Sequence, residues 1–129
     1  MPQATDIVVK NGFDVDKTFT LIAPAAGYGA AAQWNLKEGT ISAVFPTLRA
    51  TATTDASKNG LHLNFYVPAS YTDAVTGLTV VKNRAEVNIK VAIPKDFPED
   101  RKDDWVAFVS NIVNHSLIKA MVRDATSAT

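Results

Sequence analysis

The chain reads TLRATAT at residues 47–53, LHLNFYV at 61–67 and RAEVNIKVAI at 84–93. Apolar and polar residues alternate along each stretch, as they do along a β-strand that has one face buried and the other exposed to solvent. Parallel strands are normally covered on both faces, so three successive strands with a polar face indicate an antiparallel meander. Asn59-Gly60, just before the second stretch, predicts a turn there.

Residues 1–24 predict an N-terminal hairpin. Asp6–Lys10 and Lys17–Ile22 are rich in β-formers, and Asn11-Gly12 between them tolerates the positive φ angles of a turn. A further strand is expected from Ala31 to Leu36, which gives a sheet over residues 31–93. Residues 69–82 are expected to be a long loop between the second and third alternating strands.

After Pro94 the interval at which apolar residues recur changes from two residues to about 3.6 residues, the period of an α-helix. Pro98 and the acidic residues after it are typical of a helix start. Two helices are expected within residues 98–124, broken at Asn114-His115-Ser116. Apolar stripes are predicted to face inward, namely Trp105, Phe108, Val109, Ile112 and Val113 on the first helix and Leu117, Ile118, Met121 and Val122 on the second.

Because both predicted helices come after the last predicted strand, the sequence predicts one α+β domain over residues 1–129. The helices would cover one face of the sheet and leave its polar face open. The 129 residues are 47% apolar, enough for one core, and include no cysteine for a disulfide or thiolate site. With no leader-like N-terminus and no long apolar run, we expect a soluble, unexported protein.

The net charge is zero, from 13 basic and 13 acidic residues, so the chain is not a polycation. The stretch from Thr47 to Lys95, however, contains six basic residues and only three acidic ones. This local excess favours an anionic partner, although an ordinary solvated surface explains it equally well at this stage.

Catalytic and metal-binding patterns are absent from the sequence. His62 and His115 are the only imidazoles, and neither has a nucleophile or carboxylate at a recognisable spacing. The acids from Asp100 to Asp104 match no calcium-loop pattern and suit a helix N-terminus. We therefore expect no enzymatic activity, no metal and no cofactor.

The polar positions of the three alternating strands form the candidate binding surface. Hydroxyl, amide and cationic groups ordered on one sheet face can contact phosphates and the edges of unpaired bases. The alternative is a plain solvated face rich in threonine. The candidate residues are Thr47, Arg49, Thr51, Thr53, His62, Asn64, Arg84, Glu86, Asn88 and Lys90.

The order of elements resembles the coat proteins of small single-stranded RNA bacteriophages, the levivirus-type family. Ala32-Gln33-Trp34 is similar to the family's Ala-Glu-Trp, and Tyr66-Val67-Pro68 looks like its strand-terminal Val-Pro. The resemblance implies an intertwined homodimer whose two sheets join into one. Such dimers assemble in the bacterial cytoplasm into an icosahedral T=3 virion shell around the genomic RNA. Residues 69–82, with Gly77 as pivot, resemble the loop that gathers at the symmetry axes.

In that family the open sheet face lines the shell interior and binds a genomic RNA hairpin, which makes the coat protein a translational repressor and marks the RNA for packaging. The resemblance places the candidate residues on this face. Two features depart from the family pattern: Gly60, His62 and Asn64 stand where lysines are frequent, and Arg84 stands where an aromatic residue is frequent. The hairpin preferred here is therefore expected to differ.

A second function is compatible with the same pattern. A cytoplasmic homodimeric module could use the open sheet face for a small ligand or a peptide, and it would need a concave apolar pocket. An enzyme would require His62 and a carboxylate in hydrogen-bond contact within a cleft. The structure bears on both alternatives.

Overall fold

The computed structural model describes residues 2–39 and 41–129 and consists of two compact units, Met1–Pro94 and Lys95–Thr129. The boundary falls where the apolar spacing changes after Pro94. The first unit holds all the strands and the second holds the two α-helices. The organisation of residues 1–129 as one domain stays a prediction.

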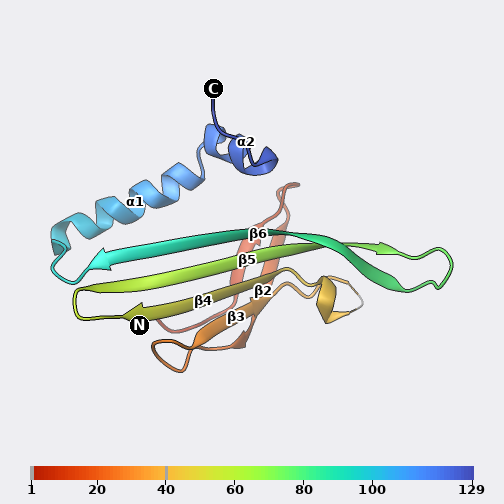
Figure 1. Cartoon of the computed structure of the whole chain (residues 1–129), viewed down its shortest axis with the longest axis horizontal. Coiled ribbons are helices and arrows are strands. Elements are labelled where there is room, and N and C mark those ends of the chain that lie inside the picture. The colour runs from red at the N-terminus through yellow and green to blue at the C-terminus, as the bar shows by residue number, and fades with distance from the viewer. Residues whose placement is uncertain (1, 40) are drawn as a thin grey trace. The chain divides into compact units, whose positions relative to one another are not determined.

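The first unit is a six-stranded sheet in the order β1-β2-β3-β4-β5-β6, with every neighbouring pair antiparallel (Figure 1). The predicted meander is therefore confirmed. A short 3-10 turn, η1 (Ser42–Val44), lies between β3 and β4. The strands are β1 (Ile7–Lys10), β2 (Asp16–Ala23), β3 (Ala31–Asn35), β4 (Thr47–Thr54), β5 (Lys58–Thr72) and β6 (Thr79–Pro94).

The predicted N-terminal hairpin is confirmed, and its turn extends past Asn11-Gly12 to span residues 11–15, which accommodates Phe13 to Val15 between the two strands. The Asn11 side chain accepts hydrogen bonds from the backbone N–H groups of Phe13 and Val15, at 2.9 and 3.1 Å. The non-glycine residue with positive φ in this turn is Asp14, at 61°. Aspartate tolerates this left-handed conformation better than most residues do.

Two predicted connections are corrected by the length of β5 and β6. Asn59 and Gly60 lie inside β5, paired with Thr54 and Thr53, and the turn before them is closed by Asp55. The Asp55 carboxylate accepts hydrogen bonds from the backbone N–H groups of Ser57 and Lys58, both at 2.8 Å. A carboxylate cap of this kind ends β4 earlier than the Asn-Gly signal suggests.

The predicted loop over residues 69–82 is also wrong in extent, because β5 and β6 pair through most of it and leave only residues 73–78 between them (Figure 1). The register shifts between Ala69 and Ser70, and this bulge breaks the alternation that would have revealed the strands. Asp73 closes the short turn by accepting from the N–H groups of Val75 and Thr76, and Gly77 has a φ of 70°.

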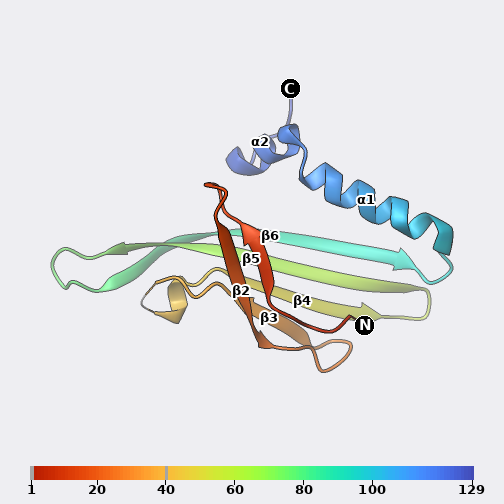
Figure 2. The same cartoon turned by 180° about the vertical axis from the view of Figure 1, so that it is seen from behind.

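The core of the first unit is small and lies where the β1–β2 hairpin curls over the apolar side of the sheet. Figure 2 shows this hairpin crossing the long strands. Phe19 on β2 is 7% exposed, and its ring centroid lies 5.8 Å from that of Phe65 on β5. Ala32 and Trp34 complete the buried cluster, and the Trp34 indole N–H donates to the Thr5 carbonyl at 2.7 Å.

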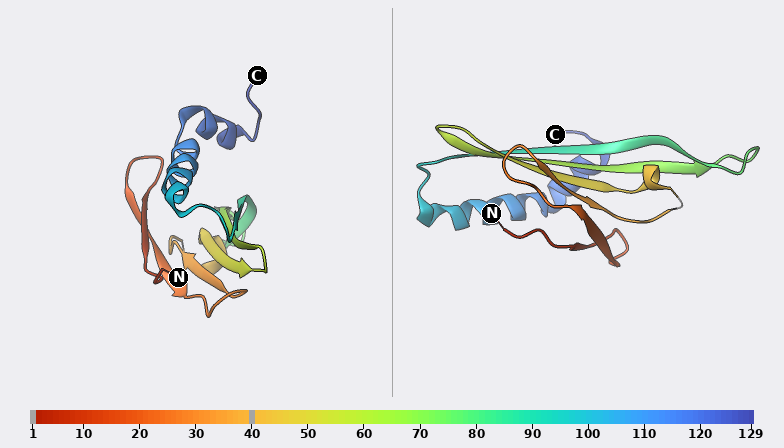
Figure 3. Two further views of the ribbon diagram at one scale, coloured as in Figure 1. Left: turned by 90° about the vertical axis from the view of Figure 1, so that its left-hand side faces the viewer. Right: turned by 90° about the horizontal axis from the view of Figure 1, so that it is seen from below.

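The second unit contains η2 (Glu99–Arg101), α1 (Lys102–Val113) and α2 (Ser116–Asp124), so the two predicted helices and the break between them are confirmed (Figure 3). His115 is the N-cap of α2, because its Nδ1 accepts the Leu117 N–H at 3.1 Å. In the single chain the predicted inward stripe is largely exposed, with Phe108 at 64% and Ile112 at 56%. That the helices cover one sheet face stays a prediction.

Replacing Phe19 tests the packing of the hairpin on the sheet. We expect Phe19→Ala to lower the free energy of unfolding by about 3 kcal/mol, because it removes a buried aromatic ring and leaves a cavity. Phe13→Ala is the matched control, because Phe13 is 90% exposed at the hairpin tip, and it should change stability by less than about 0.5 kcal/mol. Urea denaturation followed by tryptophan fluorescence measures both, and equal effects would contradict the proposed core.

The Asp55 turn predicts a pH dependence. Hydrogen bonds from the backbone of Ser57 and Lys58 hold the pKa of Asp55 below its ordinary value. Since the pKa is lower in the folded state, the stabilisation is complete above the ordinary aspartate pKa and is lost as the pH falls through the lowered one. Carboxyl NMR titration measures this pKa. An Asp55 pKa at or above that of an unstructured aspartate would contradict the turn.

Candidate nucleic-acid interface

Cross-strand partners in a sheet project their side chains to the same face. The β4–β5–β6 register therefore joins the predicted site residues into rows on one surface, the polar face. The rows are Thr47–Tyr66–Glu86, Arg49–Asn64–Asn88, Thr51–His62–Lys90 and Thr53–Gly60–Ala92, with Arg84 opposite Pro68. All ten predicted residues are thus brought together.

Thr47 differs from the other nine because it is buried, at 5% exposure. Its hydroxyl lies 3.2 Å from both Asn35 Oδ1 and the Phe45 carbonyl oxygen. A buried hydroxyl with two protein acceptors positions its neighbours and presents little to a ligand. Thr47 is therefore a structural member of the polar face.

Four further residues belong to the polar face and were missed as site residues. Gln33 and Asn35 on β3 lie opposite Arg49 and Thr47, and their alternation with Ala32 and Trp34 is a signal the sequence contains. Tyr66 alternates with Phe65 in the same way. Lys58 was missed because residues 59–60 were assigned to a turn, whereas β5 begins at Lys58 and gives it the same orientation as His62.

The polar face carries an excess of positive charge. Arg84 donates to Glu86 at 2.9 Å and its guanidinium lies 4.9 Å from the centre of the Tyr66 ring. Arg49, Lys58 and Lys90 form no ion pair among the residues that the structure describes, although the charge of Lys58 interacts with the Asp55 carboxylate. Four cations against the single anion Glu86 leave a net charge of +3 on this face.

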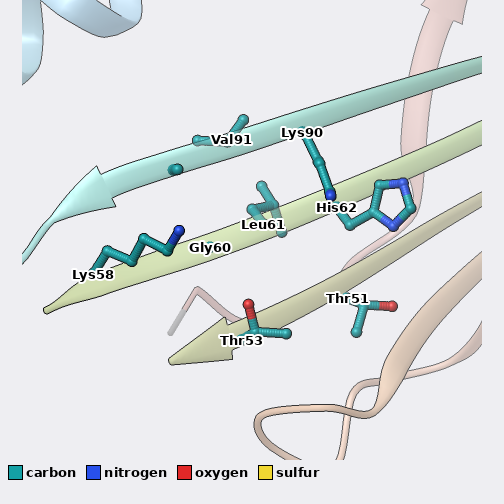
Figure 4. A pocket seen from close by; sticks show the side chains of 9 residues that line it. Thr51, Thr53, Lys58, Gly60, Leu61, His62, Lys90 and Val91 are labelled. Carbon is teal, nitrogen blue, oxygen red and sulfur yellow. The ribbon is translucent and has the colours of Figure 1, made fainter. Parts of the chain in front are cut away.

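Two hollows open on the polar face. One is lined by Thr51, Thr53, Lys58, Gly60, Leu61, His62, Lys90, Val91 and Ala92 and has a volume of about 420 Å³ (Figure 4). The other lies among Arg49, Asn64, Tyr66, Glu86 and Asn88. In the second hollow the Asn64 Oδ1 atom is buried and has no hydrogen-bond partner among the described residues. Both hollows present donors and acceptors of the kind that contact phosphates and base edges.

The geometry offers little for covalent chemistry. The hollow around His62 is lined by no carboxylate. Within residues 2–39 and 41–129, no group of three histidine, aspartate or glutamate side chains is placed to hold a metal ion. No helix in the described part of the chain has the length and apolar character needed to cross a membrane.

Solved structures of similar fold include virus-like particles of bacteriophages and of a levi-like virus, and a phage capsid protein. The virus-like particle of bacteriophage NT-214 has a TM-score of 0.86 at 16% identity, over 99% of this chain and 100% of that chain. The particle of Beihai levi-like virus 21 has a TM-score of 0.85 at 14% identity, over 99% of both chains. The bacteriophage GA capsid protein has a TM-score of 0.73 at 18% identity, over 93% of this chain and 94% of that chain.

No protein-family model and no curated protein matches the chain at the level of sequence. At these low identities the structural agreement is one of fold: an antiparallel sheet of six strands followed by two helices, the fold of levi-like phage coat proteins. The resemblance drawn from the sequence is confirmed at this level. The sequence signal was the order of the elements, since no single motif identifies the fold.

Proposed function

We propose that this chain is the structural capsid protein of a single-stranded RNA bacteriophage. It dimerises, assembles in the host cytoplasm into an icosahedral shell, and encloses the genomic RNA in the virion. The observation that carries the proposal is full-length agreement of fold with chains of virus-like particles, up to a TM-score of 0.86. The role is structural and involves no catalysis.

Dimerisation is supported by what a single chain leaves uncovered. β6 is the last strand of the sheet order, so its outer edge has no partner strand among the described residues. On its apolar face Val87 is 40% and Ile89 is 38% exposed, and Phe108 and Ile112 of α1 are more exposed still. Unpaired edges and apolar patches of this kind are normally covered by another chain. In an intertwined dimer the two β6 edges would meet and form one continuous sheet.

The RNA contact is assigned to the polar face. Its net charge of +3, its three cations that form no ion pair among the described residues and its amide-lined hollow suit phosphates together with base edges. We further propose that this face lines the shell interior and binds a hairpin of the genome, so that the protein represses translation and selects its RNA for packaging. The short turn at residues 73–78 would lie near the symmetry axes.

Assembly is the direct test of the capsid role. We expect the purified protein to elute from size exclusion as particles of megadalton size when RNA is present, and electron microscopy should show closed icosahedral shells of T=3 size. Dimers that form no shell at any salt or RNA concentration would overturn the capsid proposal. Saturable binding of a small ligand or peptide that RNA leaves unaffected would support the homodimeric binding module instead.

Substitutions on the polar face test the RNA contact. Arg49→Ala and Lys90→Ala should each weaken binding to single-stranded RNA and reduce the slope of log affinity against log salt by about 0.7, the value for one lost phosphate contact. Lys37→Ala is the matched control, because Lys37 is exposed and lies outside the polar face. Filter binding at several salt concentrations measures the slopes. Unchanged RNA binding in both variants would mean that the polar face is an ordinary solvated surface and not an RNA-binding one.

A further inference from the structure

The dipeptide Asn-Gly occurs twice in the chain, at Asn11-Gly12 and at Asn59-Gly60. Asparagine followed by glycine is prone to spontaneous loss of the side-chain amide, because the next backbone nitrogen can attack the amide carbon and glycine has no side chain to obstruct it. Both asparagines are exposed to solvent, so exposure does not distinguish the two positions. Their backbone surroundings, however, are different.

Asn11-Gly12 lies in the turn between β1 and β2, and the tip of this hairpin stands clear of the long strands in Figures 2 and 3. The Asn11 backbone N–H donates to the Val15 carbonyl at 2.9 Å, and the Asn11 carbonyl accepts the Asp14 N–H at 3.1 Å. The backbone N–H of Gly12 has no hydrogen-bond partner in the described part of the chain. The nitrogen next to Asn11 is therefore available as a nucleophile.

The Asn11 side chain is held so that its amide carbon is open to attack. Its Oδ1 atom accepts the backbone N–H groups of Phe13 and Val15, at 2.9 and 3.1 Å. When the Gly12 nitrogen adds to Asn11 Cγ, negative charge develops on Oδ1. Backbone N–H donors at these distances stabilise such a charge, as the donors of an oxyanion hole do. The turn thus provides both the nucleophile and the donors that the reaction needs.

Asn59-Gly60 lies inside the β-ladder. Asn59 is paired with Thr54 on β4 and with Ile93 on β6, and Gly60 also has a partner on each side. Backbone groups of an inner strand are engaged in inter-strand hydrogen bonds, so the Gly60 nitrogen can reach the Asn59 side chain only when the ladder opens. The Asn59 Oδ1 atom accepts a hydrogen bond from the Thr54 hydroxyl at 2.8 Å. Secondary structure therefore protects this second copy of the same dipeptide.

We propose that Asn11 is a site of spontaneous deamidation in the folded protein, and that Asn59 is protected from it. The Gly12 nitrogen loses its proton and bonds to Asn11 Cγ, the Cγ–Nδ2 bond breaks, and Nδ2 takes up a proton and leaves as ammonia. Water then opens the cyclic imide at either of its carbonyl carbons, which gives aspartate or isoaspartate. This modification site is independent of the proposed capsid function.

The two products have different effects on the hairpin. Both add a negative charge to the turn. An aspartate at position 11 can still accept the N–H groups of Phe13 and Val15, because carboxylates cap turns of this kind as amides do. An isoaspartate adds a carbon atom to the main chain, which is incompatible with the hydrogen bonds that close the turn at Val15 and Asp14.

The test is incubation of the folded, full-length protein in mildly alkaline buffer, followed by digestion at mildly acidic pH and mass spectrometry of the two Asn-Gly peptides. We expect the peptide with Asn11 to gain the mass difference between an amide and an acid about tenfold faster than the peptide with Asn59, because an exposed turn opens more often than an inner ladder. In urea-unfolded protein the two rates should become similar. Equal rates in the folded protein, or a difference that persists after unfolding, would overturn the inference.

Gly12→Ala tests the attacking nitrogen. The φ angle of Gly12 is outside the positive range and a Cβ built there meets no atom within 4 Å, so alanine fits the turn. Its methyl group should slow deamidation of Asn11 several-fold by obstructing the approach to Cγ. The Asn59 peptide of the same sample is the internal control, and its rate should be unchanged. An unchanged rate at Asn11 in a Gly12→Ala protein with unaltered thermal unfolding would contradict the proposed reaction.

Discussion

The hydrogen-bonded register of β4, β5 and β6 is the constraint on which the rest of the structure depends. Because side chains alternate along each strand, one register places Arg49, Asn64 and Asn88 in the same row and Leu48, Phe65 and Val87 on the opposite face. A slip by one residue would exchange the two faces of the slipped strand. The polar face, the core contact of Phe65 with Phe19 and the exposed apolar surface of β6 all follow from this single alignment.

The same register separates the two surfaces on which the proposed capsid role depends. The apolar side is only partly covered by the β1–β2 hairpin, and the four buried apolar side chains among the described residues are Phe19, Ala32, Trp34 and Val44. So small a core for a chain of 129 residues agrees with the proposed dimerisation, in which a second chain would bury further apolar surface. On the polar side, Arg49 and Lys90 form no ion pair among the described residues, whereas Arg84 is paired with Glu86.

Much of the fold was predictable because its signals are local. The alternation at 47–53, 61–67 and 84–93, the change of spacing after Pro94 and the break at 114–116 all indicated the observed elements. The errors arose where a local signal was overridden. Asn59-Gly60 is a strong turn signal, yet Asp55 closes the turn earlier and places both residues in β5. The bulge at Ala69 hid the extensions of β5 and β6 by interrupting the period of two.

The sequence by itself determined which residues of each alternating stretch lie on the same side of their strand, since a period of two fixes the side of every residue in a strand; it did not include Lys58, which the predicted turn at residues 59–60 excluded. It also determined the order of strands and helices from which the phage coat fold was predicted. Only the tertiary structure decided which residues are neighbours, because register depends on pairing between distant segments. That pairing placed Lys58 and Lys90 on either side of Gly60, buried Thr47, and left Arg49 without the carboxylate that Arg84 has in Glu86.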